Sequence, residues 1–148
     1  MTDRLFNTPF EMSLHILLLL DAIKAELTIE RITAYDFIAL YAPYFGFNIE
    51  PLNGENIFAF SEVTAKRKLM KTAAKELILD GLVVAKDGAN GINYTLSESG
   101  RKISRSFQSE YAMKYQKVIK HVHRRYKNKS DIELASIINR QSVRLLRR

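Results

Sequence analysis

The chain has 148 residues and a mass of 17.0 kDa, with 47% hydrophobic and 26% charged residues, which is typical of one globular domain with or without an appended arm. It contains no cysteine, which excludes thiolate metal sites, iron–sulfur clusters, catalytic thiols and disulfides, and suits a reducing cytoplasm. The longest apolar run, Ile16–Leu20, is far shorter than the roughly 20 residues that cross a bilayer, and it lacks the flanks of a signal peptide. We therefore expect a soluble, cytoplasmic protein that makes no membrane contact.

The net charge of +7 is distributed unevenly along the chain. Residues 1–60 carry 3 Lys/Arg against 8 Asp/Glu, a balance of −5. Residues 61–148 carry the other 20 Lys/Arg against 8 Asp/Glu, a balance of +12. This asymmetry indicates an acidic or polyanionic partner for the C-terminal part, although any single lysine can equally belong to a solvated helix face.

The first predicted helix spans residues 9–27, with Thr8 as its N-cap and Pro9 at its first position. It is apolar on nearly every face, so we expect it at the centre of the domain. A second helix follows Thr28 and ends before Pro43. Residues 44–60 are predicted to form a long loop whose aromatic side chains either pin it to the core or form an interface with another chain: Phe45, Phe47, Phe58 and Phe60.

A third helix is predicted from about Ser61 to Asp80, with Gly81 as its C-cap. Two β-prone runs, residues 82–86 and 92–96, flank a five-residue polar turn and predict a hairpin. Ser97 should cap the next helix, which we expect to continue unbroken to about Tyr126. At ~1.5 Å per residue such a helix would be long enough to project beyond a small domain. A short last helix is expected over residues 132–140.

The predicted fold is mainly α with a small β-hairpin, and the order of its elements resembles a winged helix. Residues 76–83 resemble the exit from the third helix of winged-helix regulators, and residues 93–101 resemble the phrase that closes their wing. The resemblance implies a winged-helix-like domain over residues 1–100. A C-terminal helical extension over residues 101–148 would then pack on this domain or project from it. The fold alone says little about function.

In a DNA-reading winged helix, the third helix enters the major groove and the wing touches the neighbouring backbone. The candidate nucleic-acid contacts lie on the third helix, the wing and the long C-terminal helix, and are Lys66, Arg67, Lys68, Lys71, Lys75, Lys86, Asn90, Lys117, Lys120 and Arg124. The third helix and wing are rich in lysine and poor in the side chains that read base edges, so contact would be mainly to phosphate, with little sequence preference. A solvated helix face, or contact with an acidic coiled coil, remains the alternative.

The sequence shows no catalytic apparatus. His121 and His123 are two residues apart on a predicted helix, so their rings point about 200° apart and cannot ligate one ion. His15 is expected to be a satisfied core or interface residue, and Asp36 and Glu50 look isolated. No phosphate-cradling glycine loop, nucleophile elbow or pair of carboxylates is present. We therefore predict no catalytic residues, no metal, no cofactor and no enzymatic activity.

The opening segment is similar to the start of the middle components of bacterial ABC-three-component systems, which reads roughly aromatic-Asn-Ser/Thr-Pro-x-Glu-x-small-Leu-Arg before an apolar helix. The matching residues are Phe6, Asn7, Thr8, Pro9, Glu11, Ser13 and Leu14, and His15 stands in place of the arginine. The similarity covers most of the chain, but only this opening is distinctive. In such systems, which include Lamassu-type anti-phage defence, the middle component accompanies an SMC/Rad50-like ATPase and an effector, often a nuclease. The resemblance implies a non-catalytic adaptor that holds the effector on the ATPase.

A stand-alone winged-helix transcriptional regulator is the alternative function. It would use the same third helix on DNA. The isolated chain would then be a symmetric homodimer, joined through the long C-terminal helix, and would prefer a palindrome. The affinity of a regulator should change with DNA sequence by orders of magnitude at fixed salt, whereas that of an adaptor should not.

Overall fold

The computed structural model describes residues 8–50, 52 and 60–146, with the side chains of 60–64 and 145–146 left aside, and the structural statements below refer to these residues. The mainly helical fold with a small hairpin is confirmed. The elements in chain order are α2 (Pro9–Ile23), β1 (Leu27–Thr28), α3 (Ile29–Leu40), the 3₁₀ helix η1 (Ala42–Phe45), α4 (Phe60–Leu79), β2 (Val83–Gly88), β3 (Gly91–Leu96), α5 (Glu98–Ser106), α6 (Glu110–Tyr126) and α7 (Asp131–Leu146).

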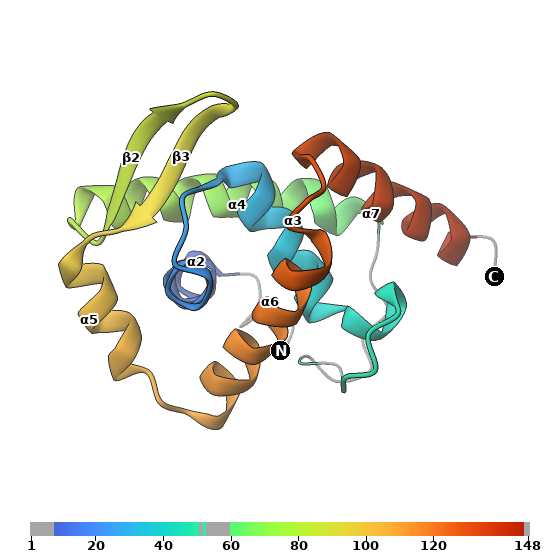
Figure 1. The fold of residues 1–148 in the computed structure, drawn as a ribbon, viewed down its shortest axis with the longest axis horizontal. Coiled ribbons are helices and arrows are strands. Elements are labelled where there is room, and N and C mark those ends of the chain that lie inside the picture. The colour runs from blue at the N-terminus through green and yellow to red at the C-terminus, as the bar shows by residue number, and fades with distance from the viewer. Residues whose placement is uncertain (1–7, 51, 53–59, 147–148) are drawn as a thin grey trace.

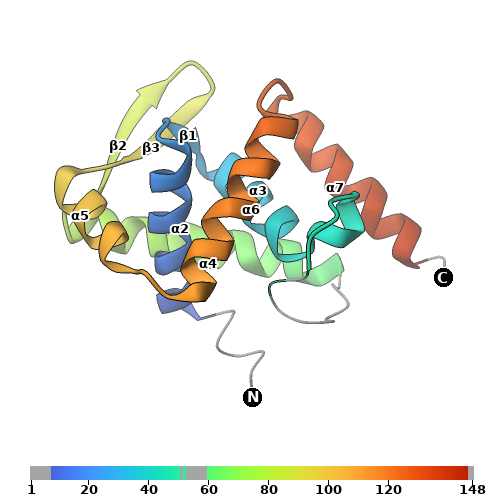
Figure 2. The ribbon, with the colours of Figure 1, turned by 60° about the horizontal axis from the view of Figure 1, so that its bottom comes forward.

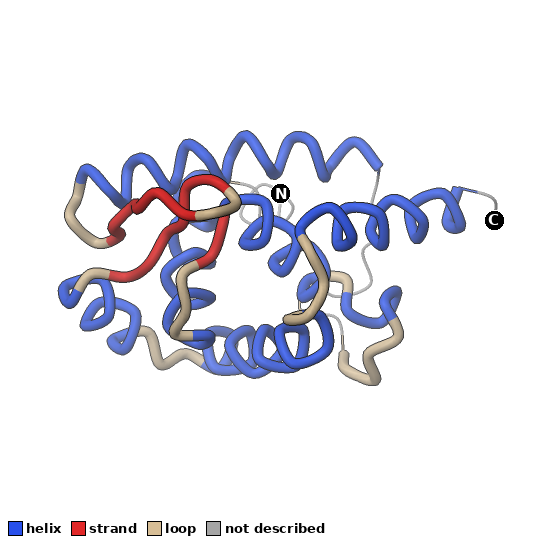
Figure 3. Tube along the Cα trace, turned by 45° about the horizontal axis from the view of Figure 1, so that its top comes forward, coloured by secondary structure: helices blue, strands red, loops and turns tan. Residues whose placement is uncertain are grey.

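Helix α2 lies at the centre of the arrangement, with α4 on one side of it and α6 on the opposite side (Figures 1 and 3). The β-hairpin and α5 lie at one end of the molecule, and α7 and η1 lie at the other (Figure 1). Helices α2 and α3 supply a large share of the buried residues, since both helices are apolar on several faces. Within the described residues, no helix combines the length and the hydropathy needed to cross a bilayer.

The three strands form one antiparallel sheet in the order β1-β3-β2 (Figure 2). Val83 pairs with Leu96 and Gly88 pairs with Gly91, so the connecting turn contains two residues rather than the predicted five. Gly91 has a φ of +112°, a conformation that glycine adopts without strain and that closes this tight turn. Strand β1 was not predicted, because two residues are too few to show an alternating pattern.

Several local start and stop signals of the helices are confirmed, but the first helix, predicted to extend to residue 27, ends at Ile23, because Lys24 adopts the left-handed conformation (φ +59°) and Leu27 pairs in β1. The Thr8 hydroxyl accepts a hydrogen bond from the Glu11 N–H at 3.2 Å, and the Thr28 hydroxyl caps α3 in the same way. After α4, Gly81 takes a φ of +75°, and its N–H and that of Leu82 bond to carbonyls in the last turn of the helix. These caps depend on neighbours in sequence, which is why the sequence alone located them.

The prediction of one long helix from residue 101 to residue 126 is wrong. Helix α5 ends at Ser106, and a new helix begins after Ser109, whose hydroxyl accepts a hydrogen bond from the Ala112 N–H at 3.1 Å. Helix α6 then packs against α2 and α3 instead of projecting from them (Figure 2). The last helix, α7, is also longer than expected, since it continues to Leu146.

Candidate functional site

The main cluster of ionisable side chains in the described structure surrounds Asp36, whose side chain is fully buried. Lys66 of α4 places its Nζ atom 2.9 Å from Oδ2 of Asp36. The Tyr115 hydroxyl of α6 donates a hydrogen bond to Oδ1 at 2.6 Å, and Nδ1 of His15, on α2, lies 2.8 Å from the same oxygen. One carboxylate of α3 therefore links the three helices packed around it. We call Asp36, Lys66, His15 and Tyr115 the ionic cluster.

Two further side chains extend the ionic cluster toward the N-terminal end of α2. The Tyr111 hydroxyl lies 3.2 Å from Nε2 of His15, and a carboxylate oxygen of Glu11 lies 3.5 Å from the same nitrogen. The imidazole of His15 also stacks on the ring of Tyr115, with centroids 4.5 Å apart. His15 is fully buried with polar side chains close to both ring nitrogens, as expected of a core residue, but its Nδ1 atom makes no hydrogen bond of regular geometry.

The electrostatics of the ionic cluster favour an ionised carboxylate. Burial by itself would raise the pKa of Asp36, but the adjacent Lys66 and His15 outweigh burial and hold that pKa well below its usual range. Burial raises the pKa of Tyr115 well above its ordinary value, and the nearby Asp36 carboxylate adds to this effect. Burial likewise raises the pKa of Tyr111. At neutral pH Asp36 is therefore an anion held by neutral hydroxyls and a buried lysine.

The sequence-based interpretation missed this cluster in two ways. Asp36 is not isolated, since it lies at the centre of the network. Lys66 is only 3% exposed, so it does not belong to the basic face predicted for contact with nucleic acid. A signal was present in the sequence, because Lys66 continues the buried stripe of Met70, Ala73 and Leu77 at helical spacing.

A second polar cluster fixes the start of α3 to the turn between α6 and α7. The Arg31 guanidinium donates to Oδ1 of Asp131 at 2.9 Å and to the Tyr126 carbonyl at 3.1 Å, and it also bonds to the Lys129 carbonyl. The Thr28 hydroxyl donates to Oδ2 of Asp131 at 2.6 Å. Since Asp131 is the first residue of α7, these bonds set the position of that helix relative to α3.

The remaining predicted basic residues are exposed, but they do not form one face. On α4, Lys68, Lys71 and Lys75 are exposed, and the Arg67 guanidinium lies 3.0 Å from Glu30. The predicted residues Lys117, Lys120 and Arg124 of α6 are exposed, as are Lys86 and Asn90 of the hairpin. Because α4 and α6 lie on opposite sides of α2, the structure separates the basic residues into two faces (Figure 3).

The aromatic residues proposed as a partner interface divide into two groups. Phe45 and Phe47 are buried, and the Arg125 guanidinium lies 3.6 Å from the ring centroid of Phe47 while donating to the Phe45 carbonyl at 2.8 Å. These two rings therefore pin their segment to the core and are not available as an exposed surface. Phe58 lies outside the described residues, as does the side chain of Phe60, the first residue of α4.

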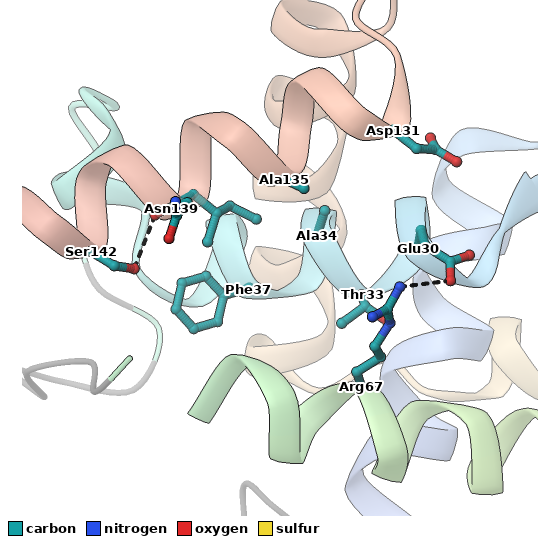
Figure 4. Close-up of a pocket in the computed structure, with 10 residues that line it drawn as sticks. Glu30, Thr33, Ala34, Phe37, Arg67, Asp131, Ala135, Asn139 and Ser142 are labelled. Atoms are coloured by element: carbon teal, nitrogen blue, oxygen red, sulfur yellow. Dashed lines mark hydrogen bonds and ion pairs between the residues drawn. The ribbon is translucent and has the colours of Figure 1, made fainter. Parts of the chain in front are cut away.

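Two cavities open on the described part of the surface. The larger has a volume of about 300 Å³ and lies between α3, α4 and α7 (Figure 4). The second, of about 280 Å³, lies between the hairpin and the ends of α3 and α6, where Asn90, Asn93 and Lys127 are among its lining residues. His123 borders this second cavity, and its Nδ1 lies 2.9 Å from the Tyr35 hydroxyl. Burial lowers the pKa of His123, so its ring is neutral at neutral pH.

Among the described residues, no three His, Cys, Asp or Glu side chains gather as metal ligands would. The ionic cluster lines neither of the two cavities, so its ionisable groups lie in the core, away from these openings, whereas Tyr35 and His123, whose pKa values are also shifted by burial, line the second cavity. The ionic cluster holds α2, α4 and α6 in fixed positions around α3. Other molecules can bind only to the exposed surfaces of these helices.

The fold and the ionic cluster define a small, mainly helical protein whose central helices are joined by ionised groups in the core. Its residues 5–148 match the family model of the ABC-three component (ABC-3C) system Middle Component 2, and the chain belongs to this family. The match confirms the middle-component resemblance of the opening segment. Comparisons with curated proteins and with solved structures gave no significant match.

Proposed function

We propose that this chain is a non-catalytic accessory subunit that links an SMC/Rad50-like ATPase to an effector in an anti-phage defence complex of the Lamassu type, in the cytoplasm. The observation that carries the proposal is the family match, which extends over residues 5–148 and so concerns almost the whole chain. The family identifies an accessory component of an ABC-three-component system. The adaptor role, the two partners and the Lamassu type are what the resemblance of the opening segment adds.

The separation of the two basic faces supports a linking role. A subunit that holds two partners together needs two surfaces that can be occupied at the same time. Helices α4 and α6 present lysine-rich exposed faces on opposite sides of α2 (Figure 3). The ionic cluster bonds both helices to Asp36, so the relative position of the two faces is fixed by buried contacts.

We include contact with the DNA backbone in this proposal. The order helix, strand, helix, helix, strand, strand, with the sheet order β1-β3-β2, supports a winged-helix arrangement in which α4 is the third helix and β2–β3 is the wing. The exposed residues Lys68, Lys71 and Lys75 would meet phosphates, whereas Lys66 is excluded by its burial. Three phosphate contacts predict that affinity falls about 40-fold between about 50 and about 200 mM salt.

The stand-alone transcriptional regulator remains the second candidate function, and the same helix α4 would serve it. The predicted dimerisation arm, a long C-terminal helix projecting from the domain, is absent from the described structure, because α5 and α6 are separate helices and α6 packs on α2 and α3. This observation favours the adaptor. A regulator would have to form its dimer through another surface.

The linking role can be tested by expressing the three components of the system with a tag on the ATPase, with and without this chain. We expect the effector to be recovered with the ATPase only when the chain is present. Recovery of the effector to the same extent without the chain would contradict the linking role.

DNA binding is tested with short duplexes of unrelated sequence at several salt concentrations. At each salt concentration we expect the chain to bind all of these duplexes with the same affinity. A preference of orders of magnitude for one sequence would support the regulator.

The contribution of α4 to DNA binding can be measured with the triple variant Lys68→Glu/Lys71→Glu/Lys75→Glu. We expect it to lose the salt-dependent binding. The matched control is Lys117→Glu/Lys120→Glu/Arg124→Glu, which makes the same charge change on α6 and should retain binding through α4. Equal binding by both variants and the unchanged chain would show that α4 is a solvated face.

A further inference from the structure

Helix α7 lies at the edge of the molecule and packs mainly on one neighbour, α3 (Figure 2). Its buried side is formed by Leu134, Ile138 and Ser142, which follow one another at intervals of four residues. On the side turned away from α3, the side chain of Ile132 is 83% exposed and that of Val143 is 38% exposed. This outer side therefore carries apolar residues that nothing in the described structure covers.

The outer residues of α7 have the spacing of a paired helix. Ile132, Ser136, Asn139 and Val143 follow one another at intervals of four, three and four residues, as in the seam of a coiled coil, and all four are exposed. We call these four residues the α7 seam. Its ends are apolar and its centre is polar. A second copy of the same seam therefore matches it when the two helices run antiparallel, because Ile132 then faces Val143 and Ser136 faces Asn139.

The charges beside the α7 seam are complementary to themselves in the same orientation. Glu133 lies near the start of α7, and Arg140 and Arg144 lie toward its end on the same flank of the seam, where all three are exposed. One carboxylate oxygen of Glu133 accepts the Ser130 N–H at 2.9 Å, so the other oxygen is open to a further contact. Among the described residues, neither arginine has an ion-pair partner.

We propose that the α7 seam binds the α7 seam of a second copy of this chain, with the two helices antiparallel and related by a two-fold axis. Glu133 of one copy is then level with position 142 of the other. Arg140 and Arg144 of the second copy lie two residues to either side of that level, or ~3 Å along the helix axis. Each carboxylate therefore meets two guanidiniums, and the two-fold axis repeats the contact. The inference goes beyond the proposed function and does not depend on it.

Other orientations and other occupants fit the α7 seam less well. In a parallel pair, Glu133 would lie beside Glu133 of the second copy, and the arginines would face arginines, so like charges would meet. DNA phosphates would meet the carboxylate of Glu133 and the apolar side chains of Ile132 and Val143. An evenly acidic or evenly basic helix would match only one end of the seam. The second copy carries both charges in the required order.

The pair is expected to be weak. Each copy carries a net charge of +7, which opposes association at long range. At 0.15 M salt the screening length is about 8 Å, so the short contacts beside the seam outweigh this repulsion. With 16 residues, α7 makes about four turns, and a pair of such helices is smaller than the interfaces of about 800 Å² per partner in stable complexes. We therefore expect a dimer in equilibrium with the monomer.

The first test is sedimentation equilibrium of the purified chain at several concentrations, in about 0.15 M salt. We expect the variant Arg140→Glu/Arg144→Glu to raise the dimer dissociation constant at least about tenfold, since like charges then flank the seam. Glu133→Gln keeps the contact with the Ser130 N–H but removes the charge, and it should also weaken the dimer. The matched control Lys117→Glu/Lys120→Glu makes the same charge change on α6 and should not weaken the dimer.

The orientation of the pair is tested by disulfide formation in a glutathione buffer, because the chain has no cysteine of its own. Ile132→Cys mixed with Val143→Cys should give a crosslinked dimer, since these positions face each other in the antiparallel pair. Neither variant alone should crosslink, because its two cysteines would be ~16 Å apart along the axis. Crosslinking of each variant alone, as efficient as that of the mixture, would overturn the antiparallel pair.

The outcomes separate this inference from the proposed function. A chain that stays monomeric up to about 1 mM, or that dimerises equally in the α7 arginine variant and the α6 control, overturns the pair and leaves the accessory function standing. A chain that pairs through α7 but recovers no other component overturns the accessory function and leaves the pair standing. Circular dichroism of each variant separates loss of pairing from loss of folding.

Discussion

The substitution Asp36→Asn should destabilise the protein strongly, although it hardly changes the shape of the side chain. It removes the negative charge that lies 2.9 Å from the ammonium of Lys66, and Lys66 is only 3% exposed. Removing one member of a buried pair and leaving the other uncompensated costs about 3–5 kcal/mol. The free energy of unfolding of domains this size is about 5–15 kcal/mol, so a large part of it is lost. The midpoint of thermal unfolding should fall by roughly 6–20 °C.

The measurement is urea unfolding of four proteins, followed by circular dichroism: the unchanged chain, Asp36→Asn, Lys66→Met and the double variant. The double variant removes both charges, so it should be more stable than the sum of the two single effects predicts. The control is Glu30→Gln, which breaks the exposed pair with Arg67 and should cost no more than about 1 kcal/mol. The reasoning would be refuted if Asp36→Asn cost no more than this control.

Three further predictions concern single contacts. In Gly100→Ala, the added Cβ would lie 2.0 Å from the Leu82 carbonyl oxygen, and the strain should cost at least about 1–3 kcal/mol in the same urea assay; an unchanged midpoint would contradict the packing of α5 on the hairpin. In Ser109→Ala, the loss of the α6 N-cap should cost about 1 kcal/mol, and an equally stable variant would show that the cap is not needed. Burial lowers the pKa of His123, so the imidazole binds a proton less readily in the folded protein than in the unfolded chain. The contribution of neutral His123 to the free energy of unfolding is therefore complete above about pH 6.5 and is lost as the pH falls below that value. The variant His123→Asn, which can still accept from Tyr35, should therefore lose less stability than the unchanged chain between about pH 7.5 and about pH 5.5, and parallel losses would contradict this.

The features predicted correctly from the sequence are those set by near neighbours. Thr8 and Thr28 cap helices through N–H groups three residues away, and Gly81 ends α4 through its own conformation. The helix break at Ser109 is also local, but the apolar spacing continues across it from Phe107 to Tyr111 and favoured one long helix. At this position the N-cap at Ser109 and the apolar spacing favoured different structures, and the chain follows the N-cap.

The ionic cluster could not be predicted in the same way, because its members come from four helices. Asp36 is separated from Tyr115 by 79 positions and from Lys66 by 30, and only the packing of α2, α4 and α6 around α3 brings them together. The number of basic residues in this segment led to the prediction that Lys66 belongs to the same exposed basic face as Lys68 and Lys71. Its position on the buried stripe of α4 was the better indicator.

The central claim, that this chain is an accessory subunit of an ABC-three-component system, is tested most directly by affinity purification of the tagged chain from cells that carry its native locus, followed by mass spectrometry. The account predicts recovery of a large SMC/Rad50-like ATPase in stoichiometric amount. Recovery of the chain alone, as a homodimer, would contradict the account and support the transcriptional regulator.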